Sequence, residues 1–219
     1  MKQIFIFAAM LFISVTTYSQ SEKYTQTMEA NVAIMDSARS VETLQDLSNL
    51  FERVANAEKN QWLPFYYAAL AKVNAGYIMT NGQMGGMAEK LDPVADKAEE
   101  LLVKAEELSK NNSEIFIVKK MIATLRMMGD PMTRYMQYGP EAAEALATAK
   151  QLNPENPRVY YLEGQDKFYT PEQFGGSKAE AVKLFQVAVD KFNSFKPESS
   201  IHPHWGKAAT EYYLIQAKK

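Results

Sequence analysis

Three stretches of the sequence repeat one spacing of small and large apolar residues. Each has an alanine, a large apolar residue four positions later and another alanine three positions after that. The sets are Ala98, Leu102, Ala105; Ala142, Leu146, Ala149; and Ala181, Phe185, Ala188. Residues three and four apart share one face of an α-helix. The alanines therefore let a neighbouring helix approach, while the large residue fills the groove between them. The pattern predicts closely packed helix pairs.

Helix starts are marked along the chain by a capping residue before proline. Such pairs occur at Asp92-Pro93, Asp130-Pro131, Gly139-Pro140 and Asn156-Pro157, and Ser177 with Glu180 forms a capping box. Runs that alternate apolar and polar residues, typical of strands, are nearly absent. The sequence predicts an all-α protein with a short helical turn over 131–138 and helices over 22–38, 41–57, 61–79, 93–110, 113–128, 140–152, 157–168, 178–193 and 203–217.

The N-terminus has the layout of a secretory signal peptide. Lys2 precedes an apolar run over Ile4–Val15, and small or polar residues follow. The run is about 12 residues, which is short for a bilayer span. We expect a signal peptide over residues 1–19, cleaved near Ser19-Gln20, and a single domain over 20–219. The mature protein is then expected in the periplasm or outside the cell, with no membrane-spanning segment.

Composition excludes several classes of function. The 219 residues are 47% hydrophobic and 23% charged, with a formal net charge of −2 and no cysteine. Disulfides and thiolate catalysis are therefore excluded, and no basic stripe indicates a nucleic-acid partner. The only histidines, His202 and His204, have no carboxylate within three residues, so no metal site is expected. No catalytic motif is present, and we expect neither an enzyme nor a bound cofactor.

The predicted partner helices carry aromatic and small residues at matching positions, as in "WLPFYYAALAKV", "YYLEG" and "WGKAATEYY". Together with the alanine sets, these segments resemble tetratricopeptide repeat (TPR) proteins over roughly residues 41–219. The combination of "NPRVYYLEGQDKFYTPEQFGG" with "HPHWG" resembles a group of small secreted TPR-like proteins of Bacteroidota. The resemblance implies a right-handed superhelix of four to five stacked antiparallel helix pairs, with a concave face suited to binding.

Loops are inserted inside the hairpins at Thr80–Asp92, Gly129–Gly139 and Tyr169–Ser177. Two of them contain paired glycines, Gly85-Gly86 and Gly175-Gly176. A phosphate-binding loop requires a preceding strand and further motif residues that are missing here. We interpret both pairs as corners of helical hairpins, with a weak anion site at a helix N-terminus as the alternative. The two corners are expected on the same side of the stack, where insertions often build a recognition surface.

Eight of the twelve methionines lie between Met79 and Met136. Three interpretations stay open: core filling, an adaptable apolar groove, and thioether binding of Cu(I). Paired tyrosines can place one ring in the core and the other toward a groove. We expect a scaffold that binds a protein segment or peptide in its concave groove; the alternative is a small-molecule-binding accessory of an envelope transport system. The candidate binding residues are Tyr66, Tyr161, Met84 and Met87.

Overall fold

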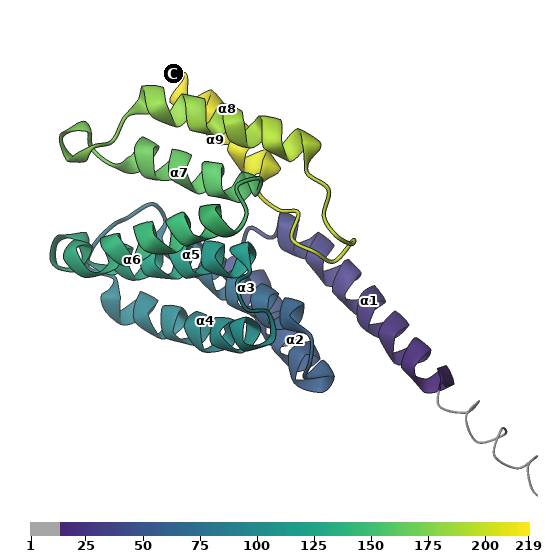
Figure 1. Ribbon diagram of the computed structural model, residues 1–219. Coiled ribbons are helices and arrows are strands. Elements are labelled where there is room, and N and C mark those ends of the chain that lie inside the picture. The colour runs from purple at the N-terminus through teal and green to yellow at the C-terminus, as the bar shows by residue number, and fades with distance from the viewer. Residues whose placement is uncertain (1–13) are drawn as a thin grey trace, which may run out of the picture.

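The structure is a computed structural model that describes the backbone of residues 14–219. Within that range it contains nine α-helices, one short 3-10 turn and no strand (Figure 1). The elements are α1 (Ser14–Ser37), α2 (Val41–Glu58), α3 (Trp62–Thr80), α4 (Ala88–Leu108), α5 (Ser113–Gly129), α6 (Pro131–Leu152), α7 (Pro157–Tyr169), η1 (Glu172–Phe174), α8 (Lys178–Ser194) and α9 (Lys207–Ala217).

From α2 onward, successive helices pack side by side and run antiparallel, so the predicted all-α stack of helix pairs is confirmed (Figure 1). Helices α6 and α7 touch over a shorter stretch than the other neighbours in this series. Helix α1 packs on α2 and α3 through buried residues such as Met28 and Val32, and its N-terminal end points away from the body of the molecule (Figure 1). The expected signal peptide over residues 1–19 lies mostly outside the described residues. Helix α1 includes the expected cleavage point, and cleavage stays a prediction.

The alanine sets fill the helix contacts, as their spacing predicts. All nine residues of the three sets are buried. A close approach of α7 to α8 depends on Gly164, because a Cβ there would lie only 2.6 Å from a ring carbon of Phe185. Small residues on one helix thus receive the large residue of the next, and this interlocking holds consecutive helices together.

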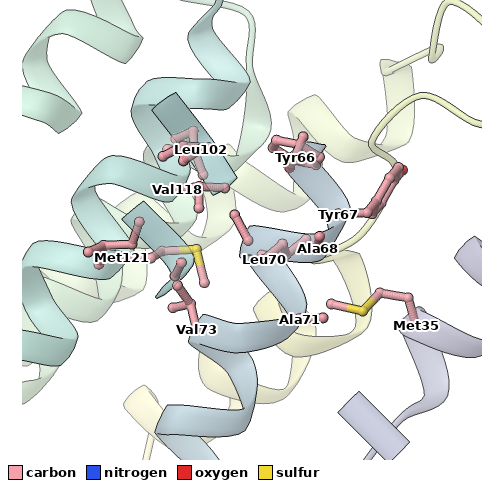
Figure 2. Close-up of a cluster of buried hydrophobic side chains, with 14 of the residues drawn as sticks. Met35, Tyr66, Tyr67, Ala68, Leu70, Ala71, Val73, Leu102, Val118 and Met121 are labelled. Carbon is pink, nitrogen blue, oxygen red and sulfur yellow. The ribbon is translucent and has the colours of Figure 1, made fainter. Parts of the chain in front are cut away.

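Helix α3 forms the centre of the core, because nearly its whole circumference is covered. Leu102 of α4 and Val118 of α5 pack on one side of it, and Met35 of α1 packs on another (Figure 2). Of the methionines between Met79 and Met136, Met121 lies inside this core, and Met79 and Met87 pack against it while partly buried. Met84, Met132 and Met136 are exposed, so the core-filling interpretation is wrong for these three.

Two of the predicted helix starts are wrong. Pro93 and Pro140 lie inside α4 and α6, which begin earlier, at Ala88 and Pro131. A proline inside a helix loses one backbone hydrogen bond. In α4, extension toward the N-terminus buries Leu91 completely. Burial of a leucine contributes about 1.5–3 kcal/mol, and this gain offsets part of the cost of the lost bond.

The other proline-marked starts are confirmed. Asp130 precedes α6, and the side chain of Asn156 accepts a hydrogen bond from the Arg158 amide at the start of α7. Ser177 caps α8 by accepting a bond from the Glu180 amide. Helix α9 begins at Lys207, four residues later than predicted.

Candidate functional site

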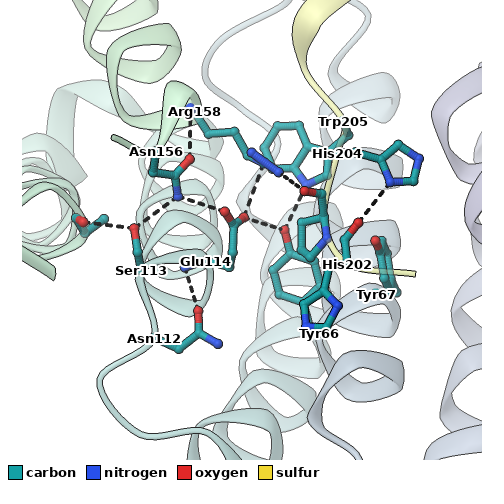
Figure 3. A network of polar contacts seen from close by, with 12 residues as sticks. Tyr66, Tyr67, Asn112, Ser113, Glu114, Asn156, Arg158, His202, His204 and Trp205 are labelled. Atoms are coloured by element: carbon teal, nitrogen blue, oxygen red, sulfur yellow. Dashed lines mark hydrogen bonds and ion pairs between the residues drawn. The ribbon is translucent and has the colours of Figure 1, made fainter. Parts of the chain in front are cut away.

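Tyr66 lies in a buried polar network between α3, α5 and α7 and the loop before α9 (Figure 3). Its hydroxyl lies 3.2 Å from a carboxylate oxygen of Glu114 and accepts a hydrogen bond of 2.8 Å from the Trp205 indole. Asn156 donates to the same carboxylate at 2.8 Å. Arg158 forms an ion pair with it at 3.2 Å. Because Tyr66 is fully buried, it presents no surface to a ligand.

Burial dominates the electrostatics of this network. It raises the pKa of Glu114, while the nearby Arg158 guanidinium opposes that rise. It also raises the pKa of the Tyr66 phenol well above its ordinary value. Arg158 donates to the Pro203 carbonyl oxygen and lies over the Trp205 ring, 5.3 Å from its centroid. The network fastens the C-terminal segment to the stack, which is a structural role.

Tyr161 is also placed inside the protein. Its ring lies against Tyr213, with centroids 6.1 Å apart, and its hydroxyl accepts a hydrogen bond from Gln165 at 3.0 Å. Burial raises the pKa of its phenol. Of the four candidate residues, Tyr66 and Tyr161 are therefore core residues. Met87 is partly buried against the core, and only Met84 is well exposed.

The corner at Gly175-Gly176 closes a helical hairpin, as predicted. The amide of Gly176 donates to the Pro171 carbonyl at 3.2 Å, and the Ser177 amide donates to the Lys167 carbonyl at 2.9 Å. A Cβ on Gly176 would lie 1.7 Å from the carbonyl oxygen of Thr170. Only glycine fits this tight return of the chain.

Three hairpin corners lie on the same edge of the molecule (Figure 1). They are the α3–α4 loop, the α5–α6 corner and the η1 loop between α7 and α8. The Gly85 amide donates to the Met128 carbonyl at 2.9 Å, and the Met87 amide donates to the Gly129 carbonyl at 3.0 Å. These bonds fasten the first corner to the second. The prediction that the two glycine corners emerge on the same side is confirmed.

This edge carries a concentration of exposed large apolar side chains, which we call the loop edge. Its members are Met84, Met132, Tyr135, Met136, Tyr169 and Phe174. Met132 is 93% exposed and Met136 is 83% exposed. Leaving such side chains in water is unfavourable, and gathered apolar surface marks a binding site more often than single exposed residues do.

An open groove of about 490 Å³ lies between α6 and α7, where these helices touch least. Its walls are Ala143, Leu146, Ala147, Lys150 and Gln151 of α6, and Glu163 and Asp166 of α7. Lys150 pairs with Glu163 at 2.9 Å, and Lys120 of α5 pairs with Asp166 at 2.6 Å. The charges in the groove therefore neutralise one another, and its α6 wall is apolar at Ala143, Leu146 and Ala147.

Groove and loop edge share one face of α6. Successive residues of an α-helix are rotated by about 100° around its axis. Five residues of α6 therefore fall within an arc of about 60° and form one stripe along the helix. The stripe consists of Met132, Met136, Ala143, Ala147 and Lys150. Its second half lines the groove, and its first half carries two exposed methionines. The groove thus continues into the loop edge, and together they form a site open to solvent with an apolar stripe along α6.

The chemistry available at this site is that of binding. Thioether sulfurs and tyrosine hydroxyls lie at the loop edge, whereas His202 lies elsewhere, 6.1 Å from the Trp62 ring and paired with Glu198 at 3.1 Å. Among the described residues, no group of three or more His, Cys, Asp and Glu side chains is arranged to hold a metal ion.

None of the helices in residues 14–219 combines the length and hydrophobicity that a bilayer span requires.

The fold and these surface features define an all-α protein of stacked helix pairs with exposed apolar side chains at one edge. No protein-family model matches the sequence, and no curated protein matches it. The solved structure of the HusA haemophore from Porphyromonas gingivalis does match. Its identity is 32%, the match covers 89% of this chain and 92% of that chain, and the TM-score is 0.78.

The chain therefore belongs to the HusA haemophore family. Porphyromonas gingivalis is a member of the Bacteroidota, so the resemblance to secreted helical proteins of that phylum is confirmed at this level. A haemophore is a binding protein and not an enzyme, in agreement with the sequence-based prediction. With no family model matched, the TPR-like description rests on helix packing alone.

Proposed function

We propose that this protein is an exported carrier that binds haem or a related porphyrin at the loop edge and the α6–α7 groove. The observation that carries the proposal is the presence of exposed apolar side chains on three hairpin corners at one edge, together with the open groove between α6 and α7. Membership in the family of a haemophore supports it. The proposal develops the small-molecule alternative raised by the sequence.

Porphyrin chemistry matches this surface. The macrocycle is a flat apolar disc, and its large faces gain free energy when they leave water. Tyr169 and Phe174 offer aromatic rings for stacking, while Met132 and Met136 offer flexible side chains that adapt to a ligand's shape. The side chains of the loop edge can hold a flat porphyrin ring without enclosing it.

The donor set of the site also fits the central iron of haem. Methionine thioethers and tyrosine phenolates both act as haem ligands in proteins. The loop edge presents both kinds of side chain, with Met132 and Met136 the most exposed. Haem bound there would be the cargo of the protein, held chiefly by contact with its ring.

A peptide in the concave face is less well supported. Two of its four expected anchors, Tyr66 and Tyr161, are buried and hydrogen-bonded inside the protein. Met84 belongs to the loop edge and becomes a candidate porphyrin contact. A protein partner is implied only as the receptor that takes the cargo from the carrier.

Titration with haemin and with metal-free protoporphyrin IX tests the proposal. Binding should saturate near one ligand per chain and produce a shifted Soret absorption band for haemin. Protoporphyrin fluorescence should change over the same protein concentrations. Absence of saturable binding for both compounds, under conditions where the protein is folded, would reject the proposal.

A further inference from the structure

The hairpin tip between α7 and α8 carries two lysines in addition to Tyr169 and Phe174 of the loop edge. Lys167 lies in the last turn of α7, and its ammonium group donates a hydrogen bond of 3.0 Å to the Gly175 carbonyl. Lys178 is the first residue of α8, and its ammonium group lies 5.9 Å from the ring centroid of Phe168. The tight corner at Gly176 holds these two helix ends together.

Neither lysine is neutralised by a carboxylate. In the part of the chain that the structure describes, no acidic oxygen lies within 4.0 Å of the ammonium group of Lys167 or Lys178. The groove differs, because Lys150 is paired with Glu163 there. One exposed carboxylate, Glu172, lies on the η1 turn between the two lysines, so the tip has a net positive charge.

We propose that Lys167 and Lys178 bind the propionate carboxylates of a porphyrin whose ring lies on the loop edge. This inference rests on the proposed function and assigns the orientation of the ligand at that site. Tyr169 and Phe174 supply exposed apolar surface on the same hairpin tip as the two lysines. Haem and protoporphyrin IX have the same division, with an apolar disc and two carboxylates at one side. Ammonium groups bind carboxylates through charge-assisted hydrogen bonds.

Lys150 is a poorer anchor for the same carboxylates. A propionate that reached it would have to displace Glu163 from contacts of 2.9 and 3.0 Å, and would then face that carboxylate. Lys167 and Lys178 have no acidic partner to lose. The charge pattern therefore places the carboxylate side of the ligand toward the η1 turn, with the ring directed to α6.

Protoporphyrin IX and its dimethyl ester test this orientation, because esterification removes the charge of the two side groups and leaves the ring unchanged. Wild-type protein should bind the diacid more tightly. The double variant Lys167→Gln/Lys178→Gln should lose about fivefold in diacid affinity per lysine, the upper range for exposed ion pairs. Its affinity for the ester should stay unchanged. The Lys167→Arg/Lys178→Arg variant keeps both charges and should retain the preference.

Lys183→Gln is the matched control, because Lys183 is exposed on α8 and already paired with Glu180 at 3.2 Å. It should bind both ligands like the wild type. Equal loss of diacid and ester affinity in the Gln variant, or an unchanged preference for the diacid, would overturn the anchor while leaving porphyrin binding itself established. Failure of the wild type to bind either compound would instead reject the proposed function, and the anchor with it.

Discussion

Replacing Met132 and Met136 with alanine should weaken porphyrin binding about 30-fold while leaving the fold intact. Full burial of a methionine side chain contributes about 1.5–3 kcal/mol. Met132 is 93% exposed and Met136 is 83% exposed, so the free protein gains almost none of this burial free energy. A flat ligand covers about half of each side chain, which gives about 1 kcal/mol, or about fivefold in Kd, for each methionine.

The same exposure predicts that stability will not change. Substitutions at solvent-exposed positions usually alter the free energy of unfolding by less than about 0.5 kcal/mol. Fluorescence titration with protoporphyrin IX measures the Kd, and urea unfolding measures stability on the same samples. A loss of binding with unchanged unfolding therefore separates ligand contact from structural damage.

Ile34→Ala is the control for this experiment. Ile34 is an exposed apolar residue on α1, away from the loop edge. Its removal should leave the Kd unchanged. Wild-type affinity in the double methionine variant would refute the assignment of these side chains to the ligand surface, and an equal loss in Ile34→Ala would indicate nonspecific adsorption.

Three further changes test the architecture. Gly164→Ala places a methyl group against the Phe185 ring, 2.6 Å away, and should lower the free energy of unfolding by about 1–3 kcal/mol, measured by urea denaturation; an unchanged midpoint would contradict the close packing of α7 on α8. Arg158→Met leaves the buried Glu114 carboxylate without its cationic partner and should lower the free energy of unfolding by about 3–5 kcal/mol in the same assay. An unchanged free energy of unfolding would contradict a stabilising role for this ion pair. Asp92→Asn tests the pH dependence: hydrogen bonds from Arg134 hold the pKa of Asp92 below its ordinary value of 3.8, so the wild type should be the more stable above that pH. The stabilities should converge as the pH falls below 3.8, and an advantage that persisted in acid would contradict the pairing.

The helical stack could be predicted because its determinants are local. Alanines two turns apart, such as Ala98 and Ala105, specify which face of a helix is packed, whichever helix packs against it. Capping residues such as Ser177 and Asn156 act within three residues of the helix start. The internal position of Pro93 could not be predicted this way, since it depends on burial of α4 against the rest of the core.

The candidate site was harder to predict because exposure is a tertiary property. Tyrosine at position 66 or 161 has the same local sequence signal whether its ring faces a groove or the core. Burial of Tyr66 depends on Glu114 and Trp205, which are distant in the sequence. The loop edge did leave a partial signal, because the prediction placed inserted corners on one side, and methionines cluster near two of them. The exposure of Met132 could not be predicted from the sequence, because it depends on the position of α6 in the fold.

The proposed function requires the ligand to lie across the loop edge and the α6–α7 groove. Amide chemical shifts of isotope-labelled protein, recorded with increasing protoporphyrin IX, test this most directly. We predict that the perturbed residues will fall in 81–87, 129–151 and 163–178. Shifts confined to α1 or to the segment 198–206, with these three ranges unaffected, would contradict the account.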